Sequence, residues 1–178
     1  EHGMKNLWDE DEAAKAKTGL DLRAYSSRLI GRDRSLVLHG GGNTSFKGAV
    51  ADRFGASKQV IWVKASGYDL GTMGVEGFTA LELPALLALA ELESLSDSDM
   101  VAEVKRARLD PQAAAASIEA IVHALVPAPY VDHSHADGVL TISNSVNGTA
   151  LLREIYGPRV MILPYVKPGF DLARQMRE

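Results

Sequence analysis

Short segments rich in β-branched and aromatic residues alternate along this chain with longer segments of helical periodicity. The clearest strand-like segment is Val60-Ile61-Trp62-Val63-Lys64, whose composition is typical of a mostly buried strand. The alternation predicts an α/β (α+β) fold in which helices cover a sheet, although the pattern does not order the strands. We expect strands at 36–39, 60–64, 130–135 and 160–166, a strand or strand extension at 139–142, and helices at 9–30, 79–95, 97–109, 117–126, 147–156 and 168–178.

The composition is that of one folded domain. The chain has 178 residues, of which 46% are apolar, so it can bury a substantial core and disorder is not expected. Its 19 basic and 23 acidic residues give a net charge of −4, and only 6% of its residues are aromatic. A nucleic-acid partner is therefore not expected, because such proteins normally combine a basic excess with stacking aromatic side chains.

Several classes of protein are excluded by what the sequence lacks. It has no cysteine, which rules out a disulfide scaffold, a cysteine-based zinc finger, an iron–sulfur cluster and a thiol nucleophile. The first eleven residues are polar and acidic, unlike a secretory signal. The longest apolar stretch, residues 81–92, contains Glu82, Pro84 and Glu91, so no membrane span is predicted. We expect a cytoplasmic protein without membrane contact.

The motif with the clearest chemistry is His133-Ser134-His135-Ala136-Asp137. Residues two apart on a strand point to the same face, so His133 and His135 can converge on one metal ion. Imidazole nitrogens suit zinc best and other borderline divalent ions next, and Asp132 or Asp137 could orient a ring. Two neighbouring histidines without metal function are an equally good interpretation of this motif alone, since a zinc site needs at least three protein ligands.

Three further motifs contain groups that bind anions. Gly40-Gly41-Gly42-Asn43-Thr44-Ser45 resembles a glycine-rich turn that presents backbone N–H groups, but it is neither a Walker loop nor a dinucleotide fingerprint. Lys64-Ala65-Ser66-Gly67 ends the predicted strand and offers a hydroxyl beside a glycine. The glycine-rich motif can equally be an ordinary sharp turn, and Lys64-Ala65-Ser66-Gly67 alone is more often a turn than a phosphate contact.

Ser117-Ile118-Glu119 opens a predicted helix, where free N–H groups and the helix dipole favour an anion. Ser117 is the expected N-cap residue, and Glu119 is either a first-turn acid or, if buried near a metal, an acid–base group. Glu119 and His123 are four residues apart and so lie on one helix face. A single helical histidine such as His123 is more typical of a packed or surface residue than of a ligand.

Taken in order, these motifs resemble the class II aldolase/adducin family. Gly42-Asn43-Thr44-Ser45, Ser66-Gly67, Ser117-x-Glu119 and His133-x-His135 carry the likeness. Longer stretches around them, such as Trp62-Val-Lys-Ala-Ser-Gly and Val131-Asp-His-Ser-His-Ala-Asp, resemble a bifunctional branch. In that branch an aldolase domain of the rhamnulose-1-phosphate type precedes a short-chain dehydrogenase domain. The resemblance covers nearly the whole chain.

The resemblance implies a three-layer αβα fold with a mainly antiparallel central sheet, and a lyase that cleaves a rhamnulose- or fuculose-type ketose 1-phosphate through an enediolate. It implies Glu119 as the acid–base group, His133 and His135 as ligands of Zn²⁺ or another divalent metal, and a homotetramer. The implied phosphate and substrate contacts are Gly42, Asn43, Ser66, Gly67 and Ser117.

This sequence departs from the family pattern in two places that matter for function. The family's third metal-binding histidine has no counterpart among His2, His39 and His123, so residues 1–178 are expected to form an aldolase domain that is incomplete at its C-terminus. Ile118 stands where stand-alone aldolases carry a second phosphate-binding serine. The alternatives are a non-catalytic adducin-like assembly module, which the intact His pair and Glu119 argue against, and a sugar-phosphate epimerase or dehydratase of the same fold.

Overall fold

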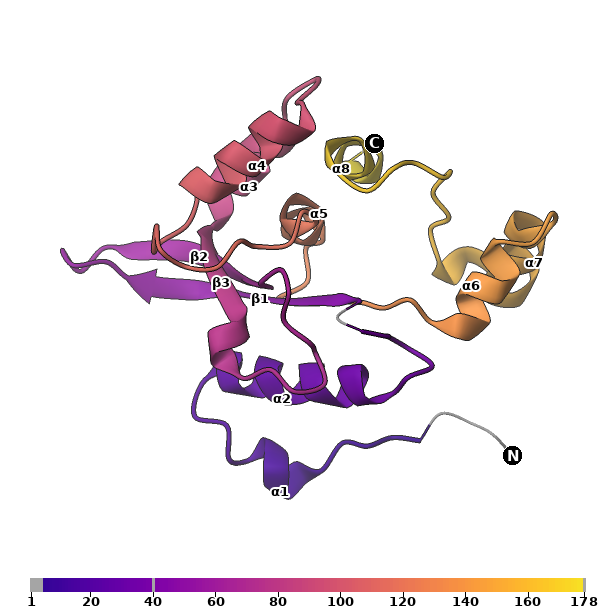
Figure 1. Cartoon of the computed structure of the whole chain (residues 1–178), viewed down its shortest axis with the longest axis horizontal. Helices are drawn as coiled ribbons and strands as arrows, with labels where there is room; N and C mark the ends of the chain where they lie inside the picture. Colours follow the sequence, from indigo (N-terminus) through magenta and orange to yellow (C-terminus); the bar gives the residue numbers. More distant parts are fainter. Residues whose placement is uncertain (1–4, 40, 178) are drawn as a thin grey trace.

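The fold is built on a four-stranded antiparallel sheet with the strand order β3-β2-β1-β4 (Figure 1). A computed structural model describes residues 5–39 and 41–177 of the chain. The sheet confirms the predicted α/β class and its mainly antiparallel character. Its strands are β1 (Asn43–Ala51), β2 (Ser57–Lys64), β3 (Phe78–Glu82) and β4 (Tyr130–His133).

Strands β1 and β2 form a hairpin in the middle of the sheet. Their register pairs Ser45 with Val63 and Ala51 with Ser57, and the Asp52 carboxylate closes the turn by accepting the amide of Ala56 at 2.9 Å. The prediction of a glycine-rich turn that runs through residues 43–45 was therefore wrong. Asn43, although polar, is buried and begins the strand, because β1 pairs on both sides, with β2 and with β4.

Helices cover both faces of the sheet, as the three-layer prediction required (Figure 1). One face packs on α2 (Gly19–Arg32), with the short helix α1 (Glu10–Ala13) beyond it. The opposite face packs on α3 (Leu83–Ala90) and α5 (Ala120–Leu125), with α4 (Asp97–Arg106) and α8 (Phe170–Arg177) completing that layer.

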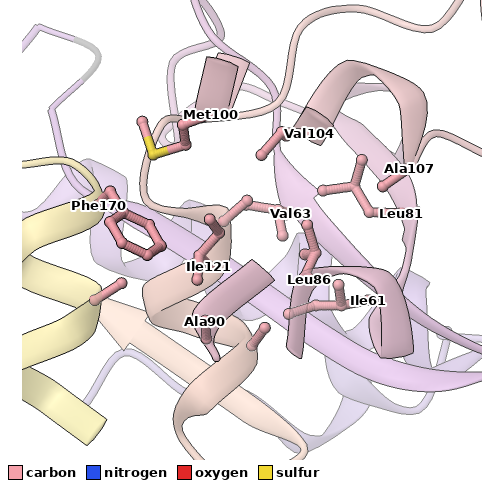
Figure 2. Packing of buried hydrophobic residues seen from close by; sticks show 13 residues of the cluster. Ile61, Val63, Leu81, Leu86, Ala90, Met100, Val104, Ala107, Ile121 and Phe170 are labelled. Carbon is pink, nitrogen blue, oxygen red and sulfur yellow. The ribbon is translucent and has the colours of Figure 1, made fainter. Parts of the chain in front are cut away.

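The larger hydrophobic core lies on the α3–α5 side of the sheet (Figure 2). Ile61, Val63 and Leu81 point into it from β2 and β3, and Leu86 and Ile121 meet them from α3 and α5. A smaller cluster of Ala24, Val37, Leu70, Met73 and Phe78 fills the α2 side.

Two predicted helices begin later than expected. The single helix predicted over 9–30 is divided, since Thr18 caps α2 through a reciprocal capping box with Asp21 and so starts a new helix. The helix predicted from residue 79 begins only at Leu83. Residues before it form β3, which follows the short 3₁₀ turn η1 (Val75–Gly77) and pairs along β2.

The C-terminal part of the chain is helical or irregular. The predicted strand at 139–142 is instead α6 (Asp137–Ser143), and residues 160–166 form no strand. A short apolar run does not by itself distinguish the two structures. The amides of His135 and Asp137 bond to the carbonyls of Leu36 and Ser35, which turns the chain away from the sheet before α6.

The remaining helix predictions are confirmed in type. Helix α7 (Gly148–Tyr156) ends at Gly157, which adopts a φ of 58° and begins the 3₁₀ turn η2 (Gly157–Arg159). Residues 36–39, predicted as a strand, are turn or irregular structure, while Gly40 and Glu178 lie outside the described residues. Among the described residues, no helix has the length and apolar character needed to cross a bilayer.

Candidate active site

The pairing of β1 with β4 sorts the site residues onto the two faces of the sheet. Asn43 is opposite His133 and Thr44 is opposite Asp132. Because alternate residues of a strand point to opposite faces, Asn43 and His133 project toward α5, and Thr44 and Asp132 project toward α2. The side-chain contacts described below agree with this assignment.

Glu119 and His133 meet on the α5 face. Glu119 is the residue immediately before α5, and its Oε2 atom lies 3.0 Å from Nδ1 of His133, with both side chains partly buried. This contact leaves Nε2 of His133 for a metal. The prediction that Asp132 or Asp137 orients the ring was wrong for His133, since Glu119 occupies that position and Asp132 pairs with Arg23 instead.

His135 lies beside His133, although it is no longer part of the strand. Strand β4 ends at His133, so the strand alternation used to predict their convergence does not extend to His135. The two ring centroids are nevertheless 4.9 Å apart. His135 is held by its own amide, which donates to the Leu36 carbonyl at 2.8 Å.

The charge state of Glu119 follows from its neighbours. Burial acts to raise the pKa of the Glu119 carboxyl, but hydrogen bonds from His133 and Asn43 and the nearby histidines outweigh it and leave the pKa below the ordinary value. At neutral pH Glu119 is therefore a carboxylate and can act as a base. The Asn43 side chain is buried, and its Oδ1 has no hydrogen-bond partner within the described part of the chain.

His123 is packed inside the protein next to this site. It is 1% exposed, its Nδ1 lies 2.9 Å from the Ser45 hydroxyl, and its ring centroid is 6.5 Å from that of His133. Burial is the main cause that lowers the pKa of His123 to about 4, so the ring is neutral. The sequence predicted a packed or surface residue, and the packed alternative is confirmed. The four-residue spacing from Glu119 was the only sign that it lies near the site.

Two of the segments predicted to contact phosphate, at Ser66 and Ser117, lie side by side. The Ser66 amide donates to the Ala115 carbonyl at 2.7 Å, and the Ser117 amide donates to the Lys64 carbonyl at 3.2 Å. Gly67 has a φ of 86° and Ser66 is exposed, so this turn faces solvent. Ser117 does not cap α5 as predicted. Its hydroxyl accepts the Glu119 amide at 3.3 Å and Glu119 takes the capping position.

Gly42 joins the site through its backbone. Its φ is 69°, and a Cβ atom there would lie 2.5 Å from Cγ1 of Val37 and 2.8 Å from the carbonyl oxygen of His133. Only glycine fits this close approach to β4, the strand that contains the candidate ligand His133.

Lys64 is a site residue that the sequence reasoning quoted but did not assign. It is buried at the end of β2, and burial lowers the pKa of its ammonium while the Asp69 and Glu119 carboxylates oppose that effect. A lysine directly before a Ser-Gly turn was the available signal. Its position near Glu119 adds positive charge beside the turn that contains Ser66.

The donor chemistry fits a divalent metal, although the set is partial. Two adjacent imidazoles, one of them oriented by a carboxylate, are the ligands that zinc prefers. Within residues 5–39 and 41–177, however, no three histidine, aspartate or glutamate side chains are grouped so as to hold an ion. A metal here needs a ligand beyond His133 and His135.

The fold and the grouping of Glu119 with two histidines define a candidate active site, and comparisons with known proteins identify the class of domain that contains it. No family model matches the chain. The solved N-terminal class II aldolase domain of a conserved protein from Thermoplasma acidophilum matches with a TM-score of 0.89 and 40% identity, covering 97% of this chain and 79% of that one. The chain therefore belongs to the class II aldolase family.

A second relative is much longer than this chain. The uncharacterized oxidoreductase YuxG of Bacillus subtilis strain 168 is 38% identical over 175 residues, which make up 98% of this chain. The chain spans a quarter of the length of that relative.

Proposed function

We propose that the chain is a metal-dependent aldolase domain that cleaves a ketose 1-phosphate of the rhamnulose or fuculose type into dihydroxyacetone phosphate and an aldehyde. The observation that carries the proposal is the 3.0 Å contact between Glu119 and His133, beside the ring of His135. It joins a candidate acid–base group to two candidate metal ligands. Family membership supplies the class of reaction.

His133 and His135 would hold Zn²⁺ or another divalent ion together with a third ligand from outside this pair. Such an ion, when bound, supplies Lewis-acid stabilisation of the negative charge that develops on the enediolate oxygens. Nδ1 of His133 is engaged by Glu119, which leaves Nε2 as its donor atom.

Glu119 moves the proton. In the cleavage direction the Glu119 carboxylate would take the proton of the C4 hydroxyl as the C3–C4 bond breaks, so that C4 becomes the aldehyde carbon and the electron pair remains on C3 as the enediolate. A proton delivered to C3 then completes dihydroxyacetone phosphate. Glu119 is the group proposed to carry that proton, and its lowered pKa makes it a competent base in the reverse, condensing direction.

The phosphate would be held by Gly42, Asn43, Ser66, Gly67 and Ser117, with positive charge from Lys64. Support comes from the backbone bonds that place Ser66 against Ala115 and Ser117 against Lys64, and from the exposure of Ser66. Asn43 also reaches Glu119, so its amide would connect the phosphate side of the site with the acid–base group.

The length and name of YuxG support a further part of the proposal. This chain matches a quarter of that oxidoreductase. We therefore infer that the aldolase domain works in one protein with a dehydrogenase that acts on the aldehyde product. We also propose a homotetramer as the working assembly, in keeping with the family resemblance.

The test is retro-aldol cleavage by the full-length protein. Metal is stripped with a chelator, Zn²⁺ is restored, and dihydroxyacetone phosphate is measured with rhamnulose 1-phosphate and fuculose 1-phosphate as substrates. Zinc-dependent release of dihydroxyacetone phosphate supports the proposal. Consumption of the substrate without this product would indicate an epimerase or dehydratase, and failure to bind any divalent metal would indicate a non-catalytic module.

A further inference from the structure

Arg23 is a buried cation on the face of the sheet opposite the candidate metal ligands. Its side chain is 2% exposed and lies under β4, where the guanidinium is 5.8 Å from the centre of the Tyr130 ring. Its Nη2 atom lies 2.7 Å from Oδ1 of Asp132, and its Nε donates to the Ser27 hydroxyl at 3.3 Å. Asp132 is the residue immediately before His133.

The strand that Arg23 contacts has a neighbouring strand on one side only. Strand β4 has four residues and lies at the edge of the sheet, where its one neighbouring strand is β1. Ser27 lies 2.8 Å from Thr44, the residue of β1 that faces Asp132. Helix α2 therefore contacts β1 through Ser27 and β4 through Arg23. The two contacts are made to Thr44 and Asp132, which are paired across the strands.

Neighbouring residues of β4 are thus fixed from opposite sides. Asp132 is bound by Arg23 on the α2 face, and His133 is bound by Glu119 on the α5 face. Burial lowers the pKa of Arg23, and the Asp132 carboxylate is the main group that opposes this shift. A buried guanidinium that lost this partner would be left poorly compensated, so the pair strongly favours one position of β4.

We propose that Arg23 is a positioning residue for the metal site, acting through Asp132 to fix the end of β4 and with it the imidazoles of His133 and His135. The inference rests on the proposed function in taking these two histidines as metal ligands. Arg23 itself contacts no proposed ligand or substrate group. Its effect on the metal is therefore indirect and must pass through Asp132.

The first measurement is Zn²⁺ affinity of the full-length protein, by competition with a chromophoric chelator, for Arg23→Gln, Asp132→Asn and the double variant. We expect each single variant to bind Zn²⁺ about tenfold more weakly, similar to the loss of an outer partner of a metal ligand. The double variant should bind Zn²⁺ no more weakly than the weaker-binding single variant, because both substitutions break the same Arg23–Asp132 pair. Effects that multiply, or no change in either single variant, would overturn the proposal.

Lys58→Gln is the matched control, because it removes an ion pair between β2 and β3, away from the β4 edge of the sheet, where Lys58 lies 2.9 Å from Glu82. It should leave Zn²⁺ affinity unchanged. Arg23→Lys, which keeps the charge, should recover part of the affinity lost in Arg23→Gln. If Arg23→Gln does not fold, Asp132→Asn carries the test, since the Asp132 side chain is 57% exposed and its loss is better tolerated.

A second measurement needs no metal. The His135 amide bonds to the Leu36 carbonyl, so its hydrogen exchange reports whether the chain after β4 is held in place. We expect exchange at least tenfold faster in Arg23→Gln and Asp132→Asn and unchanged in Lys58→Gln. Faster exchange in a protein that binds no Zn²⁺ would refute the proposed metal chemistry and still support the positioning role. Unchanged exchange would overturn the positioning role.

Discussion

Oε2 of Glu119 lies 3.0 Å from Nδ1 of His133, so the candidate acid–base group directly contacts a candidate metal ligand. Through this contact the carboxylate orients the imidazole, and the imidazole helps to keep the pKa of the carboxyl below its ordinary value. The two residues come from different elements, the start of α5 and the end of β4. Their separation therefore depends on how both elements pack against β1.

Replacing Glu119 with Gln should remove catalysis and spare the fold. Gln has the same shape and can still hydrogen-bond His133, but it cannot carry the proton. We expect the cleavage rate to fall about 10²–10⁴-fold, the usual contribution of a positioned acid–base group, with Zn²⁺ affinity changed only a few-fold. Steady-state kinetics and the chelator competition measure the two quantities. Glu103→Gln, which changes an exposed carboxylate paired with Arg106, is the control and should have wild-type activity.

Replacing either His133 or His135 with Ala should weaken Zn²⁺ binding by more than the roughly 10–100-fold that loss of an outer partner costs, because a ligand itself is removed. Equilibrium dialysis with Zn²⁺ measures this effect. His39→Asn is the control, since asparagine tolerates the positive φ of 45° at that position. Zn²⁺ affinity retained in both alanine variants would show that the ion binds elsewhere.

Stability should depend on pH through His123. Its pKa of about 4 in the fold lies below the value of about 6.5 in the unfolded chain, so acid protonates the unfolded chain first. The contribution of His123 to the free energy of unfolding should be constant above the unfolded-chain pKa. It should fall by about 2 kcal/mol between pH 7.5 and pH 5. Glu119, with its lowered pKa, also loses stabilisation as pH falls, but at more acidic pH.

Urea unfolding of the wild type and of His123→Gln at several pH values tests this prediction. Gln keeps a polar group near Ser45 and does not titrate, so its stability should be nearly flat from pH 7.5 to pH 5. An equal loss of stability in both proteins would assign the pH dependence to other groups.

Two glycines with positive φ should respond differently to alanine. Gly42→Ala combines a strained φ of 69° with contacts of 2.5 Å to Val37 and 2.8 Å to the His133 carbonyl. Gly67→Ala has similar backbone strain, at a φ of 86°, but the added Cβ atom would have no atom within 4 Å. Urea unfolding should show a loss of about 1–2 kcal/mol for Gly67→Ala and clearly more for Gly42→Ala. Equal losses would contradict the close approach at Gly42.

The fold class was predictable from the sequence, but parts of the sheet were not. Helix α4 begins after a recognisable N-cap residue, Ser96, and helix α7 ends at a recognisable glycine, Gly157. The β-branched composition of β2 is unambiguous. Strand β1 was missed because it starts with the buried polar residues Asn43-Thr44-Ser45, which resemble a turn. Their burial depends on neighbours that are distant in sequence, such as His123 for Ser45 and Ser27 for Thr44.

The candidate site was also predictable only in part from the sequence. Local motifs and the family resemblance were enough to single out Glu119, His133 and His135. The contact between Glu119 and His133 and the pairing of Arg23 with Asp132 depend on packing between separate elements, so no local pattern in the sequence contains them.

The most direct test of the central claim is the exchange of a C3 hydrogen of dihydroxyacetone phosphate with solvent deuterium, followed by NMR on the full-length protein. This half-reaction needs only the phosphate contacts, the metal and Glu119, and no aldehyde. We predict Zn²⁺-dependent exchange at a single C3 hydrogen, abolished in Glu119→Gln and retained in Glu103→Gln. Exchange that is absent from the zinc-loaded wild type, or equally fast in Glu119→Gln, would contradict the account.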